Sequence, residues 1–182
     1  MIKELLKRII YRIRGEYTIG QLKTMGLTVG ENFDAQIGFE LDPSHCWLIT
    51  IGDNVTFGPH VQVLAHDAST CKTNGYARIG KVQIGDNVFV GAGSIILPNV
   101  SIGKNAIIGA GSVVTHSVPE NTVAVGNPAR VIASVADFSE KNRVLMENVP
   151  VYEEAYTLRE GITEEMKCQQ CRELEGQVGF VK

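Results

Sequence analysis

The most regular feature of the chain is an aliphatic residue at every sixth position through its middle. These positions are Ile84, Val90, Ile96, Ile102, Ile108 and Val114, and the next residue is usually glycine. An amphipathic helix would repeat its apolar positions about every 3.6 residues, and an ordinary strand about every 2 residues. A period of six, with glycine and asparagine between the apolar positions, therefore predicts short strands separated by tight turns.

A second period, equal to three hexads, lies over the first. Residues 91–94 read Gly-Ala-Gly-Ser, and residues 109–112 repeat them unchanged. Three hexads thus form one equivalent coil of a three-sided solenoid, with glycine and asparagine at corners that require positive φ. Stacked coils would pair as parallel strands about 4.8 Å apart, with the six-spaced aliphatic side chains filling the interior.

The same register extends towards the amino terminus, with two interruptions. Its earlier apolar positions are Val29, Ala35, Ile51, Phe57 and Val63. The first interruption adds four residues, and we expect residues 42–45 to bulge outward. The second is a polar insertion, residues 67–81, which leaves the solenoid directly after His66 and returns at Val82. Long loops in compact repeats are usually functional, so this insertion marks a candidate site.

The pattern divides the chain into three parts. Residues 27–132 form the solenoid domain, which includes the insertion 67–81. Residues 1–26 begin with a basic amphipathic helix, expected to pack on this protein or on a neighbouring subunit, with a membrane surface as the lesser alternative. Residues 133–182 form a helical appendage, in which a capping box at Asp137 and Glu140 predicts a helix near 138–147. The two terminal segments are natural covers for the open ends of the solenoid.

Composition excludes several classes of protein. The 182 residues are 44% hydrophobic and 20% charged, with a net charge of −3, which is typical of one globular domain. Nucleic-acid binding is disfavoured because phosphate contacts require concentrated Lys and Arg. No apolar run approaches the roughly 20 residues of a membrane span. With four unevenly spread cysteines and no cleavable leader, the expected location is the cytoplasm.

His66 is the first candidate for catalysis. It occupies a corner of its hexad, where a side chain can reach the outer surface, and it stands at the root of the insertion. A free imidazole titrates near pH 6.5, which suits removal of a proton from a hydroxyl at neutral pH. The adjacent carboxylate, Asp67, is expected to orient the ring.

The remaining polar candidates have simpler interpretations. His45, His60 and His116 are expected to be structural or solvent-exposed. Cys71 lies in the insertion, but no base beside it would activate the thiol. Cys168 and Cys171 have zinc-ribbon spacing but lack a second ligand pair, so they are interpreted as incidental thiols.

Together, the hexads, the His66-Asp67 pair, the insertion and the segments 91–94, 109–115 and 126–130 resemble the hexapeptide-repeat acyltransferases. The resemblance covers roughly residues 27–132. It points to the branch of galactoside, maltose and virginiamycin-type O-acetyltransferases and of capsule or O-antigen acetyltransferases. It implies an all-β fold, a left-handed parallel β-helix, assembled as a homotrimer that binds acetyl-CoA between subunits.

The resemblance also assigns roles to individual residues. His66 matches the family's catalytic histidine. The positions that match the cofactor site are Phe89, Ala92, Ala110, Thr115, His116 and Arg130. Phe89 stands where relatives often have tryptophan, and His116 replaces a frequent lysine. Gln36 stands where sugar acetyltransferases often have an acceptor-binding asparagine.

The expected activity is acetyl-CoA-dependent O-acetylation of a sugar hydroxyl, on a surface-polysaccharide precursor or a small saccharide. His66 would act as general base in a ternary complex, backbone N–H groups would hold the oxyanion, and no metal would take part. Three alternatives remain open at this point. They are N-acetylation of an amino-sugar nucleotide, a zinc enzyme like the γ-carbonic anhydrases, and a catalytically inactive scaffold.

Overall fold

The computed structural model describes residues 17–182 and divides the chain into two compact units, Met1–Val135 and Ala136–Lys182. The predicted basic helix over residues 2–13 lies outside the described residues. Within the described part of the chain, no helix is both long and apolar enough to cross a bilayer. The hexad repeats all fall in the first unit.

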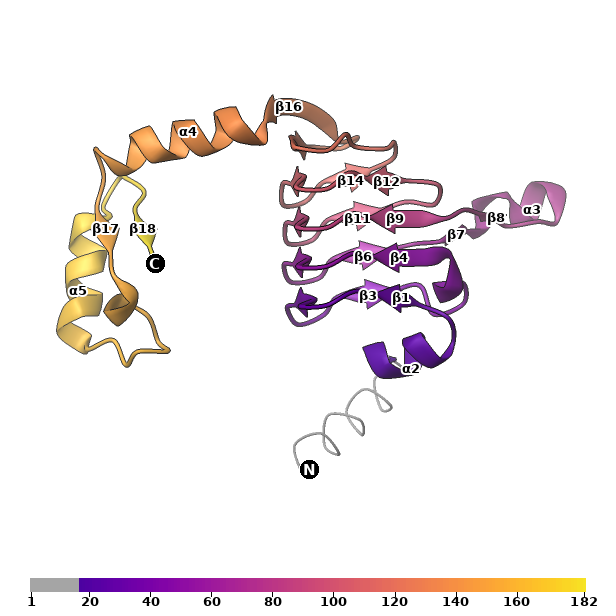
Figure 1. Ribbon diagram of the computed structural model, residues 1–182, viewed down its shortest axis with the longest axis horizontal. Helices are drawn as coiled ribbons and strands as arrows, with labels where there is room; N and C mark the ends of the chain where they lie inside the picture. Colours follow the sequence, from indigo (N-terminus) through magenta and orange to yellow (C-terminus); the bar gives the residue numbers. More distant parts are fainter. Residues whose placement is uncertain (1–16) are drawn as a thin grey trace, which may run out of the picture. The chain divides into compact units, whose positions relative to one another are not determined.

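The first unit is a stack of coils with three parallel sheets (Figure 1). The first sheet contains β1 (Thr28–Val29), β4 (Ile49–Ile51), β9 (Val82–Ile84) and β12 (Ser101–Ile102). The second contains β2 (Asp34–Ala35), β5 (Thr56–Phe57), β10 (Phe89–Val90), β13 (Ile107–Ile108) and β15 (Thr122–Val125). The third contains β3 (Glu40–Leu41), β6 (Gln62–Val63), β11 (Ile95–Ile96) and β14 (Val113–Val114). The three-sided stack of parallel strands predicted from the hexads is confirmed.

The strand register follows the predicted periods. Ile96 pairs with Val114, three hexads further along the chain. Across the bulge the offset between paired strands grows by the length of the bulge, so that Val29 pairs with Ile51. Across the insertion it grows by the length of the insertion, so that Ile51 pairs with Ile84. Both interruptions therefore leave the stacking of the coils intact.

The interior is filled by the six-spaced side chains, each at most 2% exposed from Ile84 to Val114. Full burial of such a side chain stabilises the fold by about 1.5–3 kcal/mol. At one corner, asparagines with positive φ stack above one another. Asn54 donates to Asn87, Asn87 to Asn105, and Asn105 to Asn121 through their side-chain amides. This ladder supplies hydrogen bonds at a corner whose backbone excludes most residues.

Two elements complete the ends of the first unit. The helix α2 (Ile19–Thr24) begins with a capping box at Thr18 and contributes Leu22 to the core. The strand β16 (Arg130–Ser134) pairs antiparallel with β15 in the second sheet.

The second unit contains α4 (Val135–Met146), α5 (Glu164–Glu173) and a parallel pair of short strands, β17 (Val151–Tyr152) and β18 (Phe180–Val181). The helix predicted near 138–147 corresponds to α4. It begins earlier than expected, so Asp137 lies in its first turn rather than at its N-cap. The hydroxyl of Tyr152 donates to Glu173 at 2.8 Å; burial first, and then this carboxylate, raises the pKa of Tyr152 to about 12.

Candidate active site

The insertion after His66 forms an arm that projects from the solenoid (Figure 1). Its base is an antiparallel pair, β7 (His66–Asp67) and β8 (Arg78–Ile79), in which His66 faces Ile79. Its outer part contains the short helices η2 (Ala68–Thr70) and α3 (Cys71–Asn74). The base of the arm thus holds the backbone of His66 at the solenoid corner.

One coil earlier, the bulge at residues 42–45 leaves the solenoid at the same corner. It leads into the short helix η1 (Cys46–Leu48). Cys46 is fully buried, and its sulfur lies 3.7 Å from the carbonyl oxygens of Leu22 and Met25. Trp47, the next residue, is 55% exposed. The buried thiol therefore anchors this turn to α2 while the indole faces outward.

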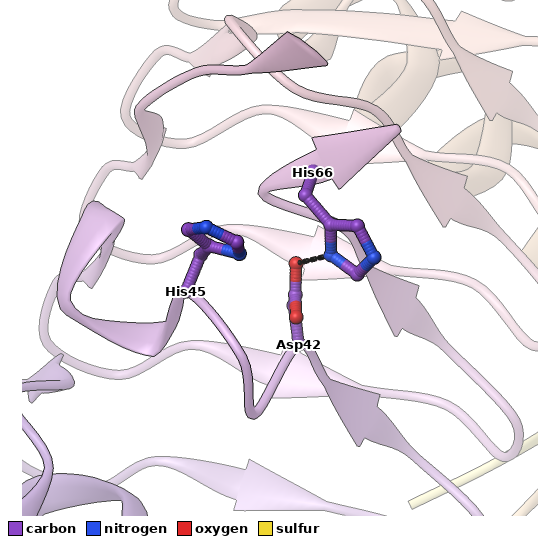
Figure 2. Close-up of side chains that lie close together, drawn as sticks. All are labelled: Asp42, His45 and His66. Atoms are coloured by element: carbon purple, nitrogen blue, oxygen red, sulfur yellow. Dashed lines mark hydrogen bonds and ion pairs between the residues drawn. The ribbon is translucent and has the colours of Figure 1, made fainter. Parts of the chain in front are cut away.

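The bulge brings a carboxylate against the His66 ring. Nδ1 of His66 lies 2.5 Å from Oδ2 of Asp42 (Figure 2). The Asp42 side chain is 0% exposed, whereas that of His66 is 36% exposed. With its proton on Nδ1, the ring would keep a free lone pair on Nε2, the nitrogen that Figure 2 shows pointing away from Asp42. A buried carboxylate thus selects both the orientation and the tautomer of a solvent-accessible imidazole.

Asp42 is held by its own set of hydrogen bonds. Its Oδ2 also accepts from the backbone N–H of Ala65 at 3.0 Å. Its Oδ1 accepts from the backbone N–H and the hydroxyl of Ser44, at 3.0 and 2.6 Å. Burial alone would raise the pKa of Asp42, but the bonds from Ser44, His66 and Ala65 together hold it below its usual value. The carboxylate is therefore ionised at neutral pH.

Asp67, the carboxylate expected to orient His66, is engaged elsewhere. Its oxygens accept from the backbone N–H of Ser69 and from the guanidinium of Arg78, both at 2.9 Å. These bonds, that to Ser69 first, lower the pKa of Asp67. Successive side chains of a strand point to opposite faces, so His66 and Asp67 diverge. Asp42, and not Asp67, lies beside the His66 ring.

His45 is a second residue that sequence reasoning passed over. Its ring centroid lies 5.3 Å from that of His66 and 5.2 Å from that of Trp47. The Ser44 hydroxyl lies 3.2 Å from Nδ1 of both histidines. A usable signal was present in the chain, because the bulge and the insertion interrupt successive coils at one corner and so must lie next to each other.

The predicted cofactor positions fall in separate places on this chain. Ala92 and Ala110 stack at the corner between the second and third sheets, next to Gly93 and Gly111, whose φ angles are +67° and +69°. A side chain at Gly91 would clash with the backbone nitrogen of Ala110, so glycine is required for this stacking. The coils therefore lie in close contact at this corner.

The other expected site residues lie at this corner and on three further surfaces. Gln36 belongs to the same corner as Ala92, two coils away, and Phe89, on the second sheet, is 45% exposed. Thr115 and His116 line an open pocket of about 800 Å³ along the corner of His66, together with Arg78. Arg130 lines a smaller pocket of about 310 Å³, which His116 also borders. Gln36 and Ala92 thus lie at a different corner from His66.

One group of side chains among residues 17–182 has the geometry to hold a metal ion. Asp42, His45 and His66 each offer a ligand atom, and these atoms lie within 4.8 Å of one another. His60, six residues before His66 in the sequence, lies at another corner, where its φ is +58°. A shared ion would have to replace the proton between His66 and Asp42.

Comparison with known proteins agrees with this architecture. Residues 81–116 match the family "Bacterial transferase hexapeptide (six repeats)". The solved structure of a maltose O-acetyltransferase from Clostridium difficile is 42% identical with a TM-score of 0.51, over 60% of this chain and 59% of that one. A hexapeptide-repeat acetyltransferase from Vibrio cholerae, solved with acetyl coenzyme A, is 27% identical with a TM-score of 0.55, over 60% of both chains.

Curated proteins that are similar in sequence include another O-acetyltransferase. Galactoside O-acetyltransferase of Escherichia coli is 41% identical over 60% of this chain and 54% of its own length. Protein CapG of Staphylococcus aureus is 45% identical over 54% of this chain and 59% of its own length. The chain thus spans less than two thirds of the curated relatives that it matches first.

The fold and the matched repeats define the solenoid as a hexapeptide-repeat transferase domain. In sequence the solenoid is similar to acetyltransferases, among them the galactoside and maltose O-acetyltransferases, and to protein CapG.

Proposed function

We propose that this protein transfers the acetyl group of acetyl-CoA to a hydroxyl group of a saccharide. The observation that carries the proposal is the exposed imidazole of His66 held through Nδ1 by the buried carboxylate of Asp42. The relatives named as galactoside and maltose O-acetyltransferases support the reaction class and the saccharide acceptor, and the Vibrio cholerae structure supports the donor.

In this mechanism Nε2 of His66 removes the proton of the acceptor hydroxyl as its oxygen attacks the thioester carbonyl. The new C–O bond forms, the C–S bond breaks, and the proton passes from Nε2 to the departing CoA sulfur. Asp42 acts as a positioning residue, because it keeps the proton on Nδ1 and stabilises the imidazolium that forms. Backbone N–H groups hold the oxyanion, and no metal is required.

The proposal assigns the catalytic module to residues 27–132, wound left-handed and assembled as a homotrimer. Gln36, Ala92 and Ala110 lie at a different corner from His66, so an active site that uses all of them must combine two subunits. Acetyl-CoA would lie in that crevice, with its pantetheine arm over the small side chains of Ala92 and Ala110. Thr115, His116 and Arg130 would face its phosphates, and Phe89 would flank it. Gln36 would contact the acceptor.

The test is CoA release measured with a thiol reagent across a panel of saccharide acceptors. Replacing His66→Ala should lower kcat by about 10²–10⁴-fold, the usual contribution of a general base. The matched control is His60→Asn, which changes a histidine at another corner to a residue that tolerates its positive φ. Near-normal transfer by the His66→Ala variant would contradict the proposal.

A further inference from the structure

Three potential metal ligands surround one point beside His66. The imidazoles of His45 and His66 lie on either side of the Asp42 carboxylate (Figure 2). The hydroxyl of Ser44 lies 3.2 Å from Nδ1 of each ring and 2.6 Å from Oδ1 of Asp42. Two imidazoles and a buried carboxylate are a ligand set suited to zinc and similar divalent ions.

The required rearrangement is small. Tetrahedral zinc with bonds of about 2.0–2.2 Å holds its ligand atoms roughly 3.4 Å apart. The ligand atoms of Asp42, His45 and His66 already lie within 4.8 Å of one another. Asp42 is fixed by the backbone of Ala65, whereas His45 lies in the bulge and is partly exposed. The His66 Nδ1 and Asp42 Oδ2 atoms, now 2.5 Å apart, would have to separate by about 0.9 Å to admit the ion. A change in the His45 side chain would bring its ring to the ion and leave a fourth position for water.

We infer that Asp42, His45 and His66 form an inhibitory binding site for a divalent ion of the zinc class. The inhibition rests on the proposed function, whereas the binding of the ion does not. His45 is the residue that distinguishes this site from the catalytic pair, because the proposed transfer uses only His66 and Asp42. Ion binding would be reversible and would require no further component.

The chemistry of the imidazole explains why the ion would inhibit. In the transfer reaction the neutral ring carries its proton on Nδ1 and uses the lone pair of Nε2. An ion at Nδ1 takes the lone pair of that nitrogen, so the single ring proton must move to Nε2. The number of protons is unchanged, but Nε2 can no longer accept one from the acceptor hydroxyl. The ion thus acts by selecting the inactive tautomer.

The chain contains a reporter for this site. Trp47 is its only tryptophan, and the indole centroid lies 5.2 Å from the His45 ring. A paramagnetic ion such as Co²⁺ bound to His45 should quench Trp47 fluorescence and show the visible absorption of tetrahedral cobalt. Exposed thiols also bind such ions, so the background is the Cys71→Ser, Cys168→Ser, Cys171→Ser variant.

In this background, we expect Co²⁺ to quench Trp47 fluorescence saturably at one ion per chain, and both Zn²⁺ and a chelator to reverse the quenching. His45→Ala should weaken Co²⁺ binding at least about tenfold, since it removes one of three ligands. The matched control, His60→Asn, should bind as tightly as the parent. Quenching that is independent of His45, or absent, would overturn the site.

A second arm measures acetyl transfer with and without Zn²⁺. Zinc should inhibit the parent at the concentrations that displace Co²⁺, whereas His45→Ala should keep the basal rate and resist zinc. His45-dependent binding without inhibition of an active parent would overturn the inhibitory role. If no saccharide is acetylated, the proposed function fails, but the cobalt measurements still decide whether the ion site exists.

Discussion

Replacing Asp42→Asn tests the proposed role of the buried carboxylate with little change in shape. Each Asp42 oxygen accepts two hydrogen bonds: Oδ2 from His66 and Ala65, and Oδ1 from the hydroxyl and N–H of Ser44. Asparagine replaces one of the two oxygens with NH₂. A backbone N–H points at each of these positions, that of Ala65 at Oδ2 and that of Ser44 at Oδ1. The backbone N–H on that side, of Ala65 or of Ser44, must then lose its acceptor, at a cost of about 1–3 kcal/mol in the free energy of unfolding.

The effect on transfer should be larger than the effect on folding. If the asparagine NH₂ faces His66, the ring must offer the Nδ1 lone pair to it, and its proton moves to Nε2. If the asparagine oxygen faces His66, the tautomer is kept, but the imidazolium loses the negative charge that stabilises it. Either arrangement should lower kcat by about 10²–10⁴-fold.

The assay is steady-state kinetics of CoA release at a urea concentration and temperature where both proteins are folded. We expect kcat to fall while the KM for acetyl-CoA changes by less than about threefold, a pattern that simple loss of folded protein would not produce. Asp67→Asn is the control, because the Asp67 carboxylate contacts Arg78 and Ser69. The reasoning is refuted if Asp42→Asn retains a kcat close to that of the parent, or if Asp67→Asn lowers kcat as far.

Three further predictions concern Asp42 at low pH, Tyr152 at high pH and the corner residue Asn87. The pKa of Asp42 is lowered in the folded state, so Asp42 stabilises the fold at pH values above the ordinary carboxyl pKa near 3.9. This stability is lost as the pH falls through the lowered pKa. The urea midpoint of Asp42→Asn should therefore fall less on acidification than that of the parent. The pKa of Tyr152 is raised to about 12, so its protonated form stabilises the fold below pH 10, and this contribution is lost as the pH rises from about 10 to 12. Tyrosinate absorbance should show a phenol that ionises near pH 12, and Tyr152→Phe should remove it. Asn87→Ala should lower the free energy of unfolding in urea by about 1–2 kcal/mol. Asn87→Gly should lower it less, because glycine freely adopts the φ of +56° found at this position. Equal losses in the two variants would contradict a contribution from backbone strain.

The solenoid was predictable because every coil repeats the same pattern of residues. A six-spaced aliphatic side chain and a corner residue that accepts positive φ suffice for each face, and Ile96 and Val114 meet in the predicted register. The short strands β17 and β18 of the second unit were not predicted. They lack a repeat, and two-residue strands are too short to show an alternating pattern.

The site was harder to predict because its partners come from different coils. The place of His66 at the root of the insertion points to it as a site residue, but the sequence offers its neighbour in the chain as its partner in space. In a strand, consecutive side chains point to opposite faces, so Asp67 turns to Arg78. Side chains in adjacent coils instead stack across the short distance between paired strands, and Asp42 reaches His66 from the coil below. The offset between them is 24 residues, beyond the reach of any local motif.

The two departures from the period explain why the candidate site lies at this corner. In the uninterrupted coils, most corner positions with positive φ carry glycine or asparagine, whose side chains are absent or hydrogen-bonded to the next coil. The bulge at residues 42–45 and the insertion at 67–81 free successive coils from that restriction at one edge, while the strands on either side keep their register. Added residues can therefore carry a carboxylate, imidazoles and an indole without loss of core packing. Their spacing is fixed by the rigid stack below them, which is what a site built from separate coils requires.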